Sequence, residues 1–198
     1  MSGPEDAARP YVRMRSTTDL AECAQLLRDV YAADGYPVEG VQDAYGWLMP
    51  PGLMEAWIAI DASRVVGHIA LCEPMGDPAA AMLMEATGAQ EHETAILARL
   101  FVAPSARGKS IARKLAITAA VYAVERHLLL AFQVRAADHH AVGLYESLGC
   151  ERLGETWHAA GDSKILMHCY VAPATVPDDL RQLLTSDSSA PEHRNQRA

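Results

Sequence analysis

The segment from residue 95 to residue 126 constrains the fold most, because it joins a buried strand to an amphipathic helix through a short basic turn. Residues 95–103 are almost continuously apolar, as in a strand that is covered on both faces, and Pro104 removes a backbone donor where this strand ends. A helix is predicted from Lys109 to about Arg126, and its apolar face holds Ile111, Leu115, Ala119 and Tyr122. The turn between strand and helix is therefore expected at one edge of a sheet.

The rest of the chain alternates strands and helices. Apolar residues at i, i+3 and i+4 predict a helix from Asp19 to Gly35, with Asp19 and Glu22 as a capping pair. The other expected elements are strands at 11–15, 57–60, 65–71, 128–134 and 164–171 and a helix at 139–148, with a hairpin at 61–64. The order β α β β β α β α β indicates an α/β fold around a mixed sheet.

A length of 198 residues suits one domain. Residues 1–10 and 172–198 are rich in small, polar and proline residues, so we expect a flexible N-terminus, a domain over residues 11–171 and a flexible C-terminal tail. Residues 179–184 could form one or two helical turns within this tail. An Ala/Met-rich stretch at 74–93 fits either a short helix or a substrate loop.

Composition excludes several classes of protein. The formal charge of −8 disfavours general nucleic-acid binding, and no apolar run reaches the ~18 residues that a membrane-spanning helix needs. Because the N-terminus lacks the pattern of a secretory signal, a cytoplasmic location is expected. The four cysteines are far apart and the histidines lack ligand spacing, so we expect reduced thiols and no metal.

The basic turn could bind an anion. Four positive charges stand within eight residues of an otherwise acidic chain, at Arg107, Lys109, Arg113 and Lys114. The start of a helix presents free backbone N–H groups, and Gly108 allows a close approach of the backbone to a ligand. An ordinary turn with solvated basic side chains is the alternative that spacing alone leaves open.

A nucleotide-binding P-loop is a second interpretation of the same residues. In it, Lys109 would contact the β- and γ-phosphates and Ser110 would bind magnesium. The pattern requires glycine where this chain has Ala103, and the next strand, 128–134, ends without an aspartate to hold the metal. We therefore disfavour a nucleotide hydrolase.

The turn resembles the first signature of the GNAT acetyltransferases, which reads Arg or Gln, two residues, Gly, one residue, then Gly or Ala. Arg107, Ser110 and Ala112 occupy its three places, and Ser110 stands where the family usually has Gly. The resemblance implies that backbone groups of Leu100, Phe101 and Val102 pair with the pantetheine arm of CoA. It also implies that the CoA pyrophosphate lies against Arg107, Gly108, Lys109, Ser110, Ile111, Ala112 and Arg113.

Residues 133–150 resemble the second signature of the same family, a strand followed by Asn, Ala, Leu-Tyr and Gly-Phe. The matching residues are Ala141, Leu144, Tyr145, Leu148 and Gly149, while Asp138 replaces the Asn and Cys150 the Phe. The resemblance extends over residues 11–171 and implies a GNAT-type mixed, mostly antiparallel sheet with helices on both faces. It further implies that Asp138 belongs to the cofactor site and that Tyr145 is the catalytic acid.

The expected function is therefore direct transfer of an acetyl group from acetyl-CoA to a primary amine of a small molecule or a protein N-terminus. A non-catalytic acyl-CoA sensor remains an alternative, because Ser110 departs from the signature and no base is evident. Base candidates are Glu73, Glu93, His139 and His140. We expect the acceptor to be selected by segments 31–57, 74–93 and 155–163. The acidic composition of the chain favours cationic acceptors. A homodimer is left open.

Overall fold

The computed structural model describes residues 9–161 and 163–185. A seven-stranded sheet in the order β1-β2-β3-β4-β5-β7-β6 forms its centre. The strands are β1 (Tyr11–Met14), β2 (Leu53–Asp61), β3 (Arg64–Cys72), β4 (Thr94–Val102), β5 (Leu129–Arg135), β6 (Glu151–Ala160) and β7 (Ser163–Val171). All neighbours pair antiparallel except β4 and β5. The predicted mixed, mostly antiparallel sheet is confirmed.

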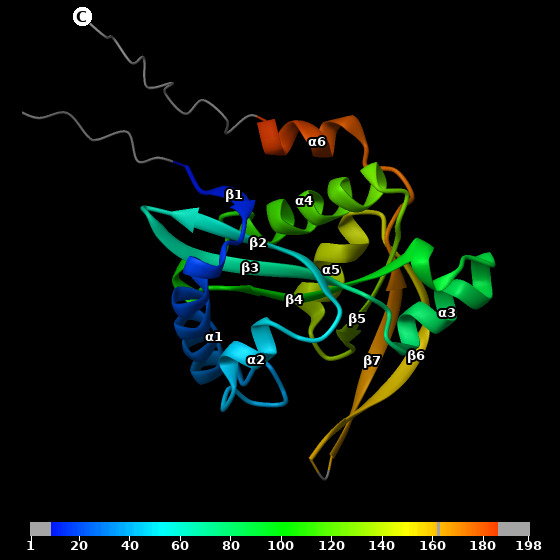
Figure 1. Cartoon of the computed structure of the whole chain (residues 1–198), viewed down its shortest axis with the longest axis horizontal. Helices are drawn as coiled ribbons and strands as arrows, with labels where there is room; N and C mark the ends of the chain where they lie inside the picture. The colour runs from blue at the N-terminus through cyan, green and yellow to red at the C-terminus, as the bar shows by residue number, and fades with distance from the viewer. Residues whose placement is uncertain (1–8, 162, 186–198) are drawn as a thin grey trace, which may run out of the picture.

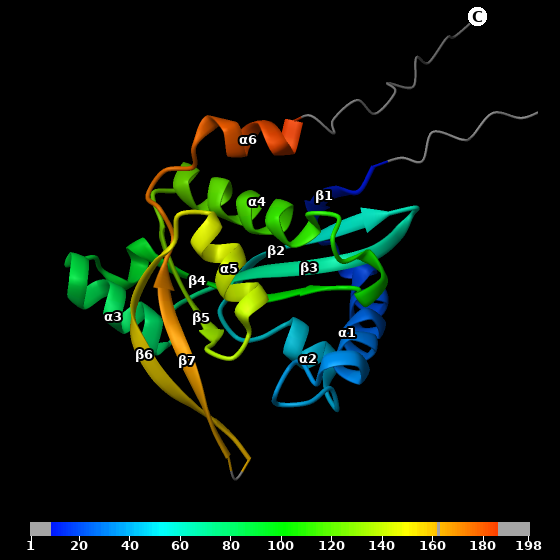
Figure 2. The same cartoon turned by 180° about the vertical axis from the view of Figure 1, so that it is seen from behind.

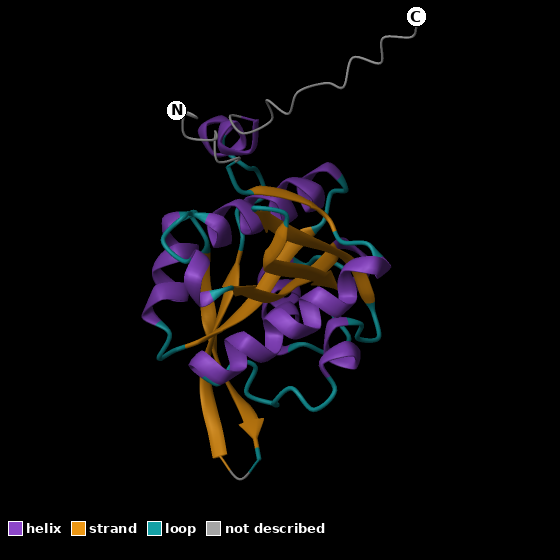
Figure 3. Ribbon diagram, turned by 90° about the vertical axis from the view of Figure 1, so that its left-hand side faces the viewer, coloured by secondary structure: helices purple, strands orange, loops and turns teal. Residues whose placement is uncertain are grey.

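Helices cover both faces of this sheet, as Figure 3 shows. They are α1 (Leu20–Asp34), α2 (Ala44–Leu48), α3 (Pro78–Thr87), α4 (Ile111–Glu125), α5 (His139–Ser147) and α6 (Asp178–Thr185). Helices α4 and α5 lie on one face, whereas α1, α2 and α3 lie on the other (Figure 1, Figure 2). Alternation along β3 fixes this division, because successive side chains point to opposite faces.

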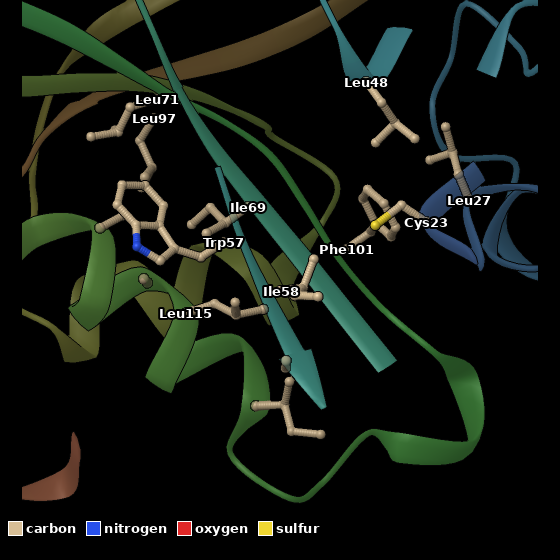
Figure 4. Packing of buried hydrophobic residues seen from close by; sticks show 14 of the residues in the cluster. Cys23, Leu27, Leu48, Trp57, Ile58, Ile69, Leu71, Leu97, Phe101 and Leu115 are labelled. Carbon is tan, nitrogen blue, oxygen red and sulfur yellow. The ribbon is translucent and has the colours of Figure 1, made fainter. Parts of the chain in front are cut away.

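The core lies on both sides of β2 and β3. Trp57, Ile69 and Leu115 pack between the sheet and α4, while Leu27 and Leu48 pack on the opposite side (Figure 4). All five are at most 3% exposed. No helix among the described residues is long and apolar enough to span a membrane.

Chain turns occur where the sequence predicts them. Helix α1 ends at Gly35 with φ of 68°, and Ala62 and Ser63 have positive φ in the β2–β3 hairpin. The predicted capping pair is wrong, because the box is formed one turn earlier by Ser16 and Asp19. Glu22 instead accepts a hydrogen bond from the Val65 N–H at 2.9 Å.

Of the two alternatives for the 74–93 stretch, the structure contains the helix, α3, which packs on β5, β6 and β7. Residues 155–160 differ from the expected element order, because they belong to strand β6, in which no described side chain is buried. Within the expected tail, residues 178–185 form α6 against α4, and the other terminal residues expected to be flexible lie mostly outside the described part.

Helix α4 approaches β3 most closely at Gly67. A Cβ at this position would lie 3.0 Å from Leu115 Cδ1 and 3.1 Å from Ile111 Cγ2. We expect Gly67→Val to lower the free energy of unfolding by about 1–3 kcal/mol through overpacking, measured by urea denaturation. Gly143→Ala is the control, because its added methyl meets no atom within 4 Å. Equal stability of Gly67→Val and wild type would contradict the close packing.

Candidate active site

The sheet opens between β4 and β5. These parallel strands pair only over Thr94–Ile96 with Leu129–Ala131, although β4 continues to Val102 and β5 to Arg135. Beyond the paired part, the β5-facing backbone groups of residues 97–102 have no strand partner. Figure 2 shows the two strands diverging beside α5. The split exposes main-chain donors and acceptors that an extended ligand can pair with.

A bulge in β4 lies at the rim of the split. Three steps along β4, from Phe101 to Ala98, oppose two steps along β3, from His68 to Ala70, and Arg99 has a φ of 58°. The carbonyl of Arg99 lies 3.0 Å from Nδ1 of His68, which is fully buried and stacks on Phe101. This contact holds the bulge in place from the neighbouring strand.

Two arginines connect this bulge to helix α2. Arg15 contacts Nε2 of His68 at 2.9 Å and donates to the Leu48 carbonyl at 2.9 Å. The Arg99 guanidinium donates to the Trp47 carbonyl at 2.6 Å, lies over the Trp47 ring and reaches Cys72 Sγ at 3.4 Å. One wall of the split is therefore tied to the last turn of α2.

His68 is neutral in the folded protein. Burial, with smaller contributions from two nearby guanidinium groups, lowers its pKa to about 3, although the Arg99 carbonyl opposes the shift. Arginine can only donate, so Nε2 accepts from Arg15, and Nδ1–H then donates to the Arg99 carbonyl.

This neutral His68 makes folding sensitive to acid. The unfolded histidine has a pKa near ~6.5, so its contribution is complete above that pH and is lost as the pH falls toward 3. We expect the difference in unfolding free energy between wild type and His68→Gln to decrease by about 2 kcal/mol from pH 7 to pH 5, measured by urea denaturation. Parallel pH dependences of the two proteins would contradict a depressed pKa.

The turn before α4 leaves a helix N-terminus open. Gly108 and Ser110 both have positive φ, 78° and 59°, and the Ser110 side chain makes no capping hydrogen bond. The N–H groups of the first turn have no acceptor within the helix. Ser110 adopts the left-handed backbone conformation that glycine adopts readily. The serine therefore keeps the backbone geometry that a glycine would give this turn, at a conformational cost of about 1–2 kcal/mol.

The basic side chains around the turn make ion pairs or hydrogen bonds with other residues of the protein. Arg107 pairs with Asp34, and Lys109 pairs with Asp61 at 2.8 Å. Arg113 donates to the Ser147 hydroxyl at 3.0 Å. Their positive charge still surrounds the turn, whereas the backbone N–H groups in the first turn of α4 have no acceptor within the helix.

Tyr145 lies on α5 beside the split. Its side chain is 6% exposed and its ring centroid lies 4.2 Å from that of Phe132 on β5. Burial, with the nearby Tyr36, Cys150 and Asp138, raises the pKa of its phenol well above the ordinary value. No atom of residues 9–161 or 163–185 hydrogen-bonds its hydroxyl group. The phenol is therefore protonated and available as a donor.

Several predicted site residues have structural partners. Asp138 caps α5 by accepting from the Ala141 N–H at 3.0 Å, and Glu93 accepts from the Gln90 N–H at 2.8 Å, within a short turn before β4. Glu73, His139 and His140 are exposed. Within the segments expected to select the acceptor, Tyr36 and Trp47 pack edge-to-face with centroids 5.8 Å apart, and Trp157 is 63% exposed.

One carboxylate near the split was missed from the sequence. Asp77, at the start of α3, accepts a hydrogen bond from the Gln133 side chain at 2.9 Å. The two residues are 56 positions apart, and neither pattern nor spacing connects them. No group of three or more histidine, cysteine or acidic side chains suited to a metal occurs in the part of the chain that the structure describes.

Comparison with known proteins shows which family shares this sequence and fold. A model of the acetyltransferase (GNAT) family matches residues 20–150, and no curated protein matches. An N-acetyltransferase from Staphylococcus aureus has a TM-score of 0.64 at 16% identity, covering 84% of this chain and 99% of its own.

Two further structures show the same fold. The ribosomal-protein-S18-alanine N-acetyltransferase of Escherichia coli has a TM-score of 0.62 at 15% identity, covering 85% of this chain and 96% of its own. A Salmonella typhimurium protein solved with its cofactor acetyl-CoA has a TM-score of 0.63 at 11% identity, covering 84% and 94%. The P-loop interpretation is thereby superseded, since the family match includes the turn. The chain belongs to the acetyltransferase (GNAT) family and is an acetyl-CoA-dependent acyltransferase.

Proposed function

We propose that this chain is an N-acetyltransferase that moves an acetyl group from acetyl-CoA directly to a primary amine of a small molecule or a protein N-terminus. The observation that carries the proposal is the split between β4 and β5, which opens beside the uncapped N-terminus of α4. Together these features offer an extended ligand an unpaired strand edge and a site for its phosphates.

The residues at the turn suit the CoA pyrophosphate. Free N–H groups of residues 108–113 can donate to its oxygens, and the positive φ of Ser110 turns consecutive amides toward one point. The backbone of Leu100–Val102 can pair with the pantetheine arm, because β5 has already diverged there. Arg107 and Lys109 would contribute mainly long-range attraction while their aspartate partners hold them.

Tyr145 supplies the donor that the transfer requires. Bound acetyl-CoA would supply a thioester whose sulfur acquires charge as the acyl group leaves. A buried phenol with a raised pKa and no protein acceptor can donate a hydrogen bond to such a sulfur. This availability favours an enzyme over a non-catalytic acyl-CoA sensor.

We infer that the acceptor enters from the face opposite Tyr145, which carries α1, α2 and α3, because the split between β4 and β5 opens through the sheet. A protein N-terminus has support from the structurally similar Escherichia coli enzyme, which is a ribosomal-protein-S18-alanine N-acetyltransferase. The net charge of −8 favours cationic acceptors through long-range attraction. Both acceptor classes therefore belong in the first assay.

Release of free thiol tests the function directly. The purified protein would be mixed with acetyl-CoA and, in separate reactions, amino sugars, polyamines and peptides with a free N-terminus, with thiol detected by a chromogenic reagent. We expect thiol release that depends on one acceptor class and a product heavier by one acetyl group in mass spectrometry. Acetyl-CoA binding without acceptor-dependent release would instead support the sensor.

The turn can be tested by adding charge at Gly108. We expect Gly108→Asp to weaken acetyl-CoA binding by tenfold or more, about 1.4 kcal/mol, because a carboxylate would stand beside the pyrophosphate. Gly88→Asp is the matched control, since Gly88 has φ of 75°, similar surrounding space and a place at the end of α3. Isothermal titration measures both, and equal affinities would place the pyrophosphate elsewhere.

The role of Tyr145 can be tested without disturbing its packing. Tyr145→Phe keeps the ring on Phe132, so we expect unchanged thermal stability but a fall in kcat of about 100-fold. Tyr170→Phe is the control, because this phenol also stacks on Phe132 but donates to Glu146 at 3.1 Å. Steady-state kinetics with the best acceptor would decide, and equal losses in both variants would argue against a specific role for Tyr145.

A further inference from the structure

Helix α3 brings a carboxylate onto the split. Asp77 is its N-cap, and Oδ1 accepts from the Ala79 N–H at 2.8 Å. The other oxygen, Oδ2, accepts from Nε2 of Gln133 on β5 at 2.9 Å. Each carboxylate oxygen can accept further hydrogen bonds, and Asp77 is only half-buried, so a ligand or water can still reach it.

The register of the sheet locates this carboxylate. Ala131 is the last residue of β5 that pairs with β4, and Gln133 lies two positions farther along the diverging strand. Because neighbouring strand residues face opposite sides, Gln133 lies on the face opposite Phe132, which contacts Tyr145. Asp77 and Tyr145 therefore lie on opposite sides of the sheet, next to the same opening.

Asp77 lies near strands on both sides of the split. Its charge contributes to the raised pKa values of Cys72 on β3, which pairs with β4, and of Cys169 on β7, which pairs with β5, although burial is the main cause of both shifts. Cys72 in turn contacts the Arg99 guanidinium at the β4 bulge. Asp77 is thus close to both sides of the split on the face from which an acceptor would enter.

We propose that Asp77 is the general base of the acetyl transfer, a role that rests on the proposed function. The acceptor nitrogen forms a bond to the acetyl carbon, and the carbon–sulfur bond breaks with its electron pair going to sulfur. The proton leaving the nitrogen passes to Asp77, directly or through one water molecule, while Tyr145 donates a hydrogen bond to the sulfur. Gln133 is a positioning residue that orients the Asp77 carboxylate.

Asp77→Asn separates this chemistry from the capping of α3, because asparagine caps helices about as well as aspartate. We expect kcat to fall by about 100-fold or more, with unchanged melting temperature and unchanged affinity for acetyl-CoA. Asp43→Asn is the matched control, since Asp43 caps α2 by accepting from the Gly46 N–H at 2.8 Å. Wild-type kcat in Asp77→Asn would overturn the proposal.

An exchange of the two side chains gives a second test. In the double variant Asp77→Asn with Gln133→Glu, the amide and the carboxylate change places and can keep their hydrogen bond. We expect it to regain at least tenfold of the kcat lost in Asp77→Asn. A double variant as slow as Asp77→Asn, although folded and able to bind acetyl-CoA, would show that no carboxylate at this contact serves as base.

Raising the pH distinguishes a base from a structural residue. A primary amine with a pKa near ~10 loses its proton in solution as the pH rises, so the need for a base decreases. We expect the ratio of wild-type to Asp77→Asn kcat to shrink at least tenfold between pH 7 and pH 9.5, and a constant ratio would overturn the assignment. Failure of the proposed function looks different, because wild type itself would then release no thiol with any amine.

Discussion

The early divergence of β4 from β5 determines the rest of the site. Two parallel strands that stop pairing after three residues leave main-chain groups that need partners. The bulge at Arg99 makes this divergence a fixed feature, because a neutral, fully buried His68 holds its carbonyl from the adjacent strand. Rigid positioning of this kind matters for catalysis, since small displacements of reacting groups reduce rates strongly.

The turn before α4 illustrates the difference between charge and geometry in binding an anion. In the sequence, the cluster of basic residues predicts an anion site at the turn. In the structure, Arg107 is paired with Asp34 and Lys109 with Asp61. The Arg107–Asp34 pair is exposed and the Lys109–Asp61 pair partly exposed, and exposed pairs contribute little to stability, at most about 1 kcal/mol. The strained conformation of Ser110 is the more informative feature, because a left-handed serine at an uncapped helix start is maintained at a cost.

The sequence was sufficient where one physical signal dominates. Buried strands such as 128–134 and the helix after Pro104 have strong apolar patterns, and the structure contains both. Strand β6 was missed because none of the side chains described for this edge strand is buried, so no apolar run marks it in the sequence. The contact between Asp77 and Gln133 was missed for another reason, since it depends on how an inserted helix docks 56 residues away.

Helix α3 explains how this chain can lack an acid on β4 and β5 near the split. A glutamate on β5 would be a direct way to place a carboxylate there, but the strand supplies Gln133, a neutral donor. The amide can hold a carboxylate from another segment, and the N-cap of a docked helix is a favourable place for one. Because α3 packs its alanines and Leu83 against the sheet, the position of Asp77 is set by the core rather than by a mobile loop. The same packing couples the chemistry to stability, so substitutions that shift α3 should alter the site even when they leave Asp77 unchanged.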